Sequence, residues 1–385
     1  MAERRVLLVS HNHPAVRPGG AEAYALELYE AMRRSAEFDA VLLARSGPPV
    51  SQATRPHEGT LLQGMDGDPG QYLFYTDVSH YDWLFGRSPD KRPLTTHFRD
   101  FLLAHEPHVV HFQHTLFLGY DAVRVARATL PDAAIVYTLH ELLPICHNNG
   151  QMVRTQTSAL CHAESPRRCH ECYPGIPPQM FFLRKRFIQS HLRQVDLFTV
   201  PSRFLYDRYV AWGIPPERLH VEEYGRALAP AAARRTDEDR PRTRFGFFGQ
   251  LSHFKGVTVA LRAMDELGED FEGRLVVHGA NLELQPQPFR DEFGSLLERT
   301  KPTVTFAGAY EPGEVTRLMA DVDWVVVPSI WWENSPIVIQ EALLHGRPVI
   351  CSDIGGMAEK VTAGVNGLHF RVRDAASLAR TIQHA

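Results

Sequence analysis

The chain has 385 residues, of which 44% are hydrophobic and 22% are charged, and its formal net charge at pH 7 is −4. This composition is typical of a soluble globular protein with two or three domains, and the small negative charge argues against a nucleic-acid partner. No apolar run approaches the roughly 18 residues of a membrane span, and the five-residue run near the N-terminus is too short for a signal peptide. We therefore expect a cytoplasmic protein that contacts the inner membrane face peripherally at most.

The first half of the chain predicts a parallel sheet covered by helices. Short apolar or β-branched runs, each typical of a buried strand, lie at residues 6–10, 40–45, 72–76, 109–113, 135–139 and 197–201. Between the first two runs, apolar residues at spacings of three and four predict a helix from about Gly20 to Arg34. Continuous apolar strands that alternate with helices indicate a parallel sheet buried on both faces.

The same alternation starts again after residues 225–243, which are rich in Ala, Pro, Arg and acidic residues and have no periodic apolar face. Strand-like runs follow at 245–249, 275–279, 304–308, 324–329 and 348–352. We expect an α/β protein with two Rossmann-like, doubly wound parallel-sheet domains that face a central cleft, with ligands at the carboxyl ends of the strands. The expected division is 1–225 with an insertion at 141–177, a connector at 226–243, and a second domain at 244–385.

The loop and helix after the run at 324–329 carry two carboxylates. Ser335 is predicted to cap a helix that starts at Pro336, whose first N–H groups would form an anion site. Glu333 lies in the preceding loop and Glu341 lies eight residues further on, so one carboxylate can reach a sugar in the cleft and the other a ribose. Glutamates at this spacing are common, but the strand before them and the glycine turn after them favour a functional role for this pair.

Two turns contain glycine at a strand-to-helix junction. In the second half, Gly249 ends a strand and Lys255 and Gly256 begin a helix, an arrangement that could clamp a diphosphate. In the first half, Gly19 and Gly20 precede the predicted helix, where the backbone can approach a ligand, although an ordinary turn is an equal alternative. The first-half turn has the glycine spacing of neither a phosphate loop nor a dinucleotide site, which argues against a dinucleotide cofactor.

Three histidines follow predicted strands of the first half: His140 after one strand, and His111 and His114 after another. A single histidine at a strand end is more often structural than catalytic. Three that converge on one edge of a sheet make it more probable that at least one has a function.

Taken together, these motifs resemble the retaining, nucleotide-sugar-dependent glycosyltransferases of the GT-B fold, family 4. The resemblance covers most of the chain and is carried by "PGGAEAY", "YTLHE", "GQLSHFKG" and "ENSPIVIQEAL…GRPVICSDIGGMAEKV…GVNGLHF". It implies that Lys255 binds the donor diphosphate, that Glu341 binds the donor ribose and that Glu333 lies at the donor sugar. His140 would lie beside the reacting anomeric carbon. The other donor-side positions would be Gly249, Gln250, Gly256, Asn334, Ser335, Pro336 and Ile337, and the acceptor-side positions Gly19, Gly20, His111 and His114.

The sequence departs from this family in two places. Members usually carry an arginine where Gln250 stands, so one charge-assisted contact to the diphosphate is lost or replaced, with Arg226 as a candidate substitute. Members also usually end with a helix that returns to the first domain, whereas this chain stops early, at "LARTIQHA", so either the final helix is short or further residues are missing.

The resemblance implies transfer of a sugar from a UDP- or GDP-type donor to a carbohydrate or lipid-linked acceptor, with retention of the anomeric configuration. The pathway would be polysaccharide or glycoconjugate biosynthesis. Lys255 and helix N-termini would stabilise the leaving diphosphate without a catalytic metal or an organic cofactor. The alternatives are a nucleotide-sugar 2-epimerase of related fold and a non-catalytic partner that binds the donor. The sequence leaves the oligomeric state open.

Four of the five cysteines fall inside the insertion. Their spacing, Cys146-x14-Cys161-x7-Cys169-x2-Cys172, fits a four-thiolate structural zinc site, for which three nearby histidines are possible substitutes. These substitutes are His147, His162 and His170. Packed thiols and disulfides are the less favoured alternatives, and a four-ligand site would leave no open position for catalysis.

Overall fold

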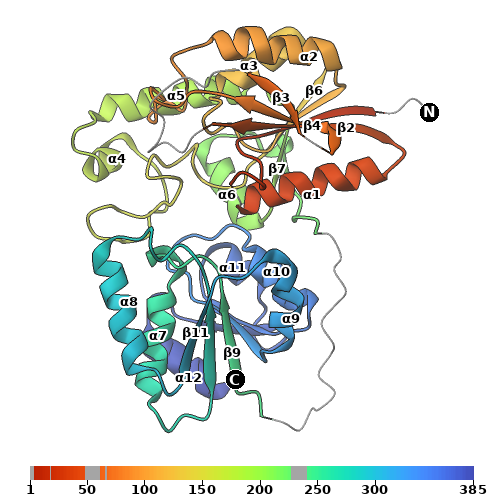
Figure 1. Ribbon diagram of the computed structural model, residues 1–385. Helices are drawn as coiled ribbons and strands as arrows, with labels where there is room; N and C mark the ends of the chain where they lie inside the picture. The colour runs from red at the N-terminus through yellow and green to blue at the C-terminus, as the bar shows by residue number, and fades with distance from the viewer. Residues whose placement is uncertain (1–3, 18, 48–60, 66, 227–240) are drawn as a thin grey trace. The chain divides into compact units, whose positions relative to one another are not determined.

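The structure is a computed structural model that describes residues 4–17, 19–47, 61–65, 67–226 and 241–385. The chain divides into two compact units, Met1–Ala227 and Leu228–Ala385. Most of the predicted connector, residues 227–240, lies outside the described residues. Figure 1 shows both units.

The first unit contains an eight-stranded sheet of order β3-β4-β2-β1-β5-β6-β7-β8, parallel except for the β3–β4 pair. The strands are β1 Arg4–Ser10, β2 Phe38–Ser46, β3 Leu62–Met65, β4 Asp68–Tyr75, β5 Val109–Phe112, β6 Ala134–Thr138, β7 Leu197–Val200 and β8 Leu219–Val221. All six strands predicted for this half are present. The pairing of β1 with both β2 and β5 buries Leu7, Leu8 and Val110 completely, because these residues lie in the middle of the sheet.

Helices cover this sheet on both faces (Figure 1). The helical elements of this unit are α1 Gly20–Arg34, the π-helical turn Pro93–Phe98 that continues into α2 Arg99–His105, α3 Asp121–Thr129, α4 Pro166–Cys172, which packs on α5, α5 Pro178–Leu192, α6 Arg203–Trp212 and the 3-10 turn Pro216–Arg218. The helix predicted from Gly20 to Arg34 is confirmed. Its buried residues include Ala25 and Tyr29, and the partly buried Leu28 and Met32 pack beside Tyr29 against the residues of β1 and β2.

One carboxylate of this layer should contribute measurably to stability. Asp121 begins α3, and its Oδ2 accepts from Lys91 Nζ at 2.5 Å while His191 lies 3.5 Å from Oδ1. Burial alone would raise the pKa of Asp121, but these two partners lower it from 3.8 to about 2. The stabilisation is therefore present above pH 4 and is lost as the pH falls towards 2. We expect Asp121→Asn to lower the free energy of unfolding by about 2 kcal/mol at pH 7 in urea titrations, and by much less at pH 2.

The second unit contains a six-stranded, fully parallel sheet of order β11-β10-β9-β12-β13-β14. Its strands are β9 Arg244–Phe248, β10 Arg274–His278, β11 Val304–Gly308, β12 Trp324–Val327, β13 Val349–Ser352 and β14 Gly367–Phe370. Its helices are α7 Val257–Leu267, α8 Gln287–Arg299, α9 Val315–Ala320, α10 Ile337–Leu344, α11 Gly355–Lys360 and α12 Ala375–His384, with 3-10 turns at His253–Lys255 and Pro312–Glu314.

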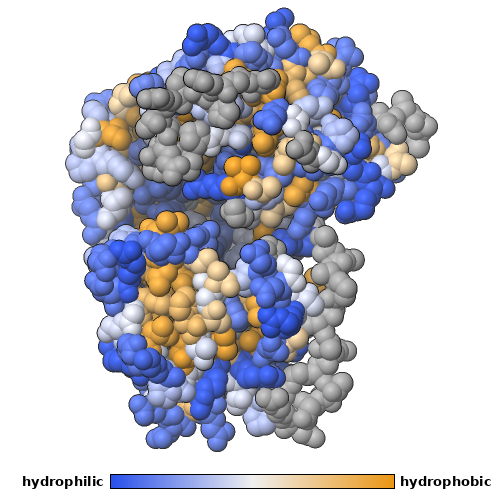
Figure 2. Space-filling model, in the orientation of Figure 1, coloured by the Kyte–Doolittle hydropathy of each residue, from blue (hydrophilic) through white to orange (hydrophobic). Residues whose placement is uncertain are grey.

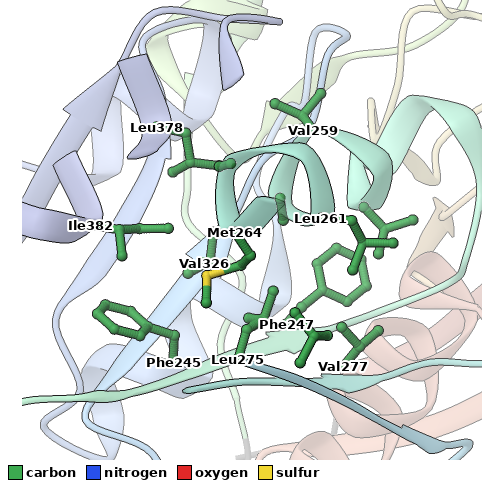
Figure 3. Close-up of a cluster of buried hydrophobic side chains, with 14 of the residues drawn as sticks. Phe245, Phe247, Val259, Leu261, Met264, Leu275, Val277, Val326, Leu378 and Ile382 are labelled. Carbon is green, nitrogen blue, oxygen red and sulfur yellow. The ribbon is translucent and has the colours of Figure 1, made fainter. Parts of the chain in front are cut away.

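Each face of the second sheet has its own core. On one face, α7 and α12 bring Met264, Leu378 and Ile382 against Phe245 of β9, as Figure 3 shows. On the other face, α10 and α11 cover β12 and β13. Both sheet faces are thus closed by helices, and the carboxyl ends of the strands are where loops can carry functional groups.

Candidate active site

In the second unit, Lys255 and Glu333 form an ion pair at the carboxyl edge of the sheet. Lys255 ends the turn that follows β9, and Glu333 lies in the loop that follows β12, the neighbouring strand. The Nζ of Lys255 donates to Oε1 of Glu333 at 2.6 Å. The parallel order of β9 and β12 therefore brings together two residues that are 78 positions apart in the sequence.

The Glu333 carboxylate is buried and holds its charge through its neighbours. Its Oε1 also accepts from the Ser329 hydroxyl at 2.8 Å and from the Trp331 indole N–H at 2.9 Å. Burial would raise the pKa of Glu333, but the Lys255 ammonium and these two donors outweigh it and hold the pKa below its usual value. Glu333 is thus an ionised acceptor with a fixed orientation.

The start of α10 differs from the prediction. The helix begins at Ile337 with Pro336 at the N-cap position, and no side chain caps it, so the expected cap by Ser335 is wrong. Proline at the cap leaves the preceding residue outside the helix, and the Ser335 hydroxyl is buried without a hydrogen-bond partner among the described residues. A buried hydroxyl beside the N–H groups of a helix start is suited to a ligand oxygen.

Close backbone packing holds this loop in place. The N–H of Gly356 donates to the carbonyl of Glu333 at 2.8 Å, and a Cβ at Gly356 would lie 1.7 Å from the carbonyl oxygen of Asn334. Gly256, with φ of +69°, passes so close to Pro328 that a Cβ there would lie 1.9 Å from its carbonyl oxygen. Glycine is therefore required at Gly256, where the β9 loop approaches the segment after β12, and at Gly356, where the start of α11 packs on the same segment.

Other predicted donor-side residues lie along the same edge. Gly249 directly follows β9, and the neighbouring Gln250 is exposed. Glu341 is half-buried in α10, near Tyr310. Arg226, the candidate substitute for the missing arginine, belongs to the first unit, where it pairs with Glu27 at 3.3 Å.

An open hollow of about 540 Å³ lies at the ends of β10 and β11, and its lining includes Gly279, Ala280, Phe306 and Gly308. Figure 2 shows apolar residues gathered on the second unit over this region of the sheet. Phe306 is exposed here because it lies on the edge strand β11, and Leu284, in the segment before α8, is exposed as well. The hollow adjoins Gly249, whose N–H donates to the carbonyl of His278 at the end of β10.

In the first unit, His140 lies at the carboxyl end of β6 in a hydrogen-bonded network. Its Nδ1 lies 2.7 Å from the hydroxyl of Tyr224, and its Nε2 lies 3.0 Å from Oε1 of Gln113. Burial, with smaller contributions from neighbouring histidines, lowers the pKa of His140 well below 6.5. The ring is therefore neutral near pH 7, with its orientation set by both nitrogens.

Two histidine–glutamate pairs lie beside this network. His11, after β1, pairs with Glu22 of α1 at 3.0 Å, and His114, after β5, pairs with Glu141 at 2.7 Å. The two imidazole rings are tilted by 41° to one another, with their centroids 4.3 Å apart. Burial, followed by the nearby His114, lowers the pKa of His11. The carboxyl ends of three adjacent strands, β1, β5 and β6, thus form one polar cluster.

The structure places the other first-unit candidates differently. His111 lies inside β5, where its Nε2 contacts the Thr138 hydroxyl at 2.7 Å, and burial lowers its pKa to about 4. It supports the cluster from within the sheet. Gly19 is the N-cap residue of α1 and Gly20 is its first residue, so both lie near Glu22 at the start of the helix.

Residues 18–222, more than half of the chain, match the family described as Glycosyltransferase Family 4, and residues 242–385 match Glycosyl transferases group 1. The chain belongs to glycosyltransferase family 4. This membership confirms the predicted enzyme class, a nucleotide-sugar glycosyltransferase.

Relatives and solved structures agree with this assignment. This family 4 glycosyltransferase is 25% identical to a glycogen synthase of Mycobacterium tuberculosis over 98% of the chain and 85% of that protein. It is 24% identical to a D-inositol 3-phosphate glycosyltransferase of Nocardia farcinica over 98% and 80%. Two solved structures, Anabaena HepE with UDP and glucose and sucrose-phosphate synthase from Thermosynechococcus elongatus, are each 18% identical, cover 99% of the chain and 89% of theirs, and give TM-scores of 0.63 and 0.70. The predicted GT-B fold is confirmed.

Sequence reasoning missed several members of both clusters in this glycosyltransferase. In the first unit it missed His11, Glu22 and Glu141, although His11 directly follows a predicted strand and could have been found by that position. In the second unit it missed Ser329 and Trp331, which have no recognisable spacing to Glu333 beyond lying in the same loop.

The four cysteines predicted to bind zinc are not in a ligand arrangement in this glycosyltransferase. Within the described ranges, no group of three or more His, Cys, Asp or Glu side chains is placed to hold a metal ion. The four cysteines of the insertion are present as thiols, and burial raises the pKa of Cys146 and, to about 11, that of Cys169. A high thiol pKa argues against a nucleophilic role for these residues.

Proposed function

We propose that this glycosyltransferase transfers a sugar from a UDP- or GDP-type nucleotide-diphosphate sugar to a hydroxyl of a carbohydrate or lipid-linked acceptor, with retention of the anomeric configuration. The observation that carries the donor assignment is the Lys255–Glu333 pair, 2.6 Å apart, in the loop that leads to the unpartnered Ser335 hydroxyl at the start of α10. A cation, a helix N-terminus and a fixed carboxylate match a diphosphate that is attached to a sugar.

The donor diphosphate would lie against Lys255 and the first turn of α10. An ammonium has three N–H bonds and Lys255 donates one of them to Glu333, so the others can turn towards phosphate oxygens. Negative charge grows on the diphosphate as it leaves, and both the cation and the helix N-terminus stabilise that charge. Because Gln250 is neutral, this site has one cation fewer than the family pattern.

The rest of the donor would follow the same edge of the sheet. Glu341 on α10 would accept from the ribose hydroxyls, and Asn334 and Ile337 would present polar groups to the sugar or phosphate. The open hollow at Gly279 and Phe306 is mainly apolar and would take the base. The solved HepE structures contain UDP or UDP-glucose, which is consistent with a donor of this kind.

The acceptor would use the polar cluster of the first unit. His140, neutral and held by Tyr224 and Gln113, would contact the sugar near its anomeric carbon. The acceptor hydroxyl would pass its proton to the leaving phosphate, since the proposed mechanism with retention needs no separate base. The reaction would use no organic cofactor and no catalytic metal, and any zinc at the cysteines would be structural.

We also propose a cytoplasmic location with peripheral membrane contact at most. Among the described residues, no helix combines the length and the apolar character needed to cross a bilayer. Helix α5 exposes Phe182 and Leu183, by 53% and 49%, beside Lys185 and Arg186. Apolar and basic side chains on one helix are suited to a weak contact with an anionic surface.

A thermal-shift screen of nucleotide sugars, followed by mass spectrometry of the stabilising donor, tests the function. We expect a UDP- or GDP-sugar to raise the melting temperature and to release nucleoside diphosphate when an acceptor is present. Conversion of the donor sugar without any acceptor would instead indicate the 2-epimerase. If the protein binds the donor tightly but converts it with none of the acceptors tested, it would be a non-catalytic partner.

A further inference from the structure

Four of the chain's five cysteines line one small cavity in the first unit. The cavity is small, with a volume of about 30 Å³. Its thiols come from three separate places: a turn after β6, the loop before α4, and α4 itself, which supplies two. They are Cys146, Cys161, Cys169 and Cys172. Apolar packing alone would not be expected to bring four thiols from three separate segments to one cavity.

The other possible ligands around this cavity are occupied or less suited. Glu164 lines it, but its Oε1 pairs with Lys185 Nζ at 2.8 Å. His170 lies on α4 but contacts the Ile176 carbonyl through Nδ1 at 2.9 Å. His147 lines the cavity beside Cys146 and remains a possible substitute.

Two guanidinium groups lie at the cavity. Arg154 and Arg168 both line it, and Arg154 pairs with Glu171 on α4. A zinc ion with four thiolates carries two net negative charges, and the two guanidinium groups would offset them.

We propose that these four thiols bind one zinc ion, which staples the insertion at residues 141–177. As four Zn–S bonds form, the thiols release their protons to solvent, and no oxidation or reduction takes place. The side chains are not in a ligand arrangement in the described structure, so metal binding must draw the sulfurs inward. The backbone is already tied together, because the Thr155 hydroxyl donates to the Cys172 carbonyl at 2.8 Å and the Cys161 N–H donates to the Met152 carbonyl at 2.7 Å.

A zinc ion that holds the insertion together would also affect the polar cluster, because the insertion begins at Glu141, the partner of His114. The N–H of Cys146 donates to the Leu142 carbonyl at 2.8 Å, which places this thiol one turn after Glu141. Arg184 fixes the same turn by donating to the carbonyls of Leu143 and Pro144 at 2.6 and 2.7 Å. Zinc at Cys146 would therefore hold the segment that positions Glu141.

Zinc content tests the site without any assay of sugar transfer, so it can fail or succeed independently of the proposed function. Protein purified without chelators or a metal column should contain about one zinc ion per chain by mass spectrometry. Cys169→Ser should lose most of it, whereas Cys351→Ser, in the buried core of the second unit, should keep it. Wild-type protein with less than about 0.2 zinc per chain, even after incubation with zinc, would overturn the proposal.

Two further measurements on the wild-type chain avoid the risk that a variant fails to fold. Replacement of the metal by Co²⁺ should give the visible absorption of a tetrahedral thiolate site, and an octahedral spectrum would refute four-thiolate ligation. Removal of the metal should speed hydrogen exchange in residues 141–177 by at least about tenfold while leaving the second unit unchanged. Equal hydrogen exchange in residues 141–177 with and without the metal would refute the proposal that zinc stabilises the insertion.

Discussion

Lys255→Ala is expected to lower kcat/KM for sugar transfer by at least about tenfold, because it removes the one lysine placed beside the proposed diphosphate site among the described residues. Loss of a single preorganised donor to a developing negative charge typically costs about 10²–10³ in rate. The missing arginine at Gln250 makes the dependence on Lys255 stronger, because fewer cations share the charge. Steady-state kinetics with the donor found in the screen would measure the effect.

The matched control is Lys301→Ala, which removes an exposed lysine that pairs with Glu298 at the far end of α8. It should change kcat/KM by less than about twofold, as expected for a surface ion pair. Lys255→Ala also leaves the buried Glu333 carboxylate without its cation, so the melting temperature of the variant protein must be measured as well. A folded Lys255→Ala enzyme with the wild-type rate would remove Lys255 from the site.

His140→Ala is expected to lower kcat by about 10²-fold while leaving the donor dissociation constant nearly unchanged. The reason for this separation is that His140 belongs to the first unit, whereas the proposed donor groups Lys255 and Glu333 belong to the second. Kinetics combined with calorimetric titration of the donor would separate the two effects. Tyr224→Phe, which removes one partner of the ring, should give a smaller loss in kcat.

His97→Ala is the control for this substitution, since His97 is exposed on the π-helical turn before α2. It should leave kcat unchanged. A weakened donor affinity with unchanged kcat in His140→Ala would contradict the proposed role of His140 at the anomeric carbon. The buried, neutral ring also has a pH consequence: below about pH 6.5 the unfolded chain takes up a proton that folded His140 does not, so its burial lowers stability as the pH falls.

Strong local patterns in the sequence were sufficient for most of the fold. The apolar runs at 6–10 and 324–329 correspond to β1 and β12 because a strand buried on both faces has no polar position to interrupt it. The short edge strands β3, β8 and β14 were missed, since an edge strand is buried on one side and has little pattern. The Ser335 cap was wrong because proline at the next position takes the cap itself.

The candidate sites were predictable in part. Glu333 and Lys255 were found separately by their positions at strand ends, but their direct contact depends on the order of β9 and β12 in the sheet, which no local pattern reveals. The same limit explains why the contact between the His11 and His114 rings was not foreseen, since it needs β1 and β5 to be neighbours. Local sequence patterns identify candidate residues, whereas the order of the strands in the sheet determines which of these residues come into contact.

The most direct test of the central claim is the anomeric configuration of the transferred sugar, measured by NMR on product made with the donor and acceptor that support turnover. Transfer with retention predicts that the product has the configuration of the donor, and that Lys255→Ala forms it more slowly without changing it. A product of inverted configuration would contradict the proposed mechanism.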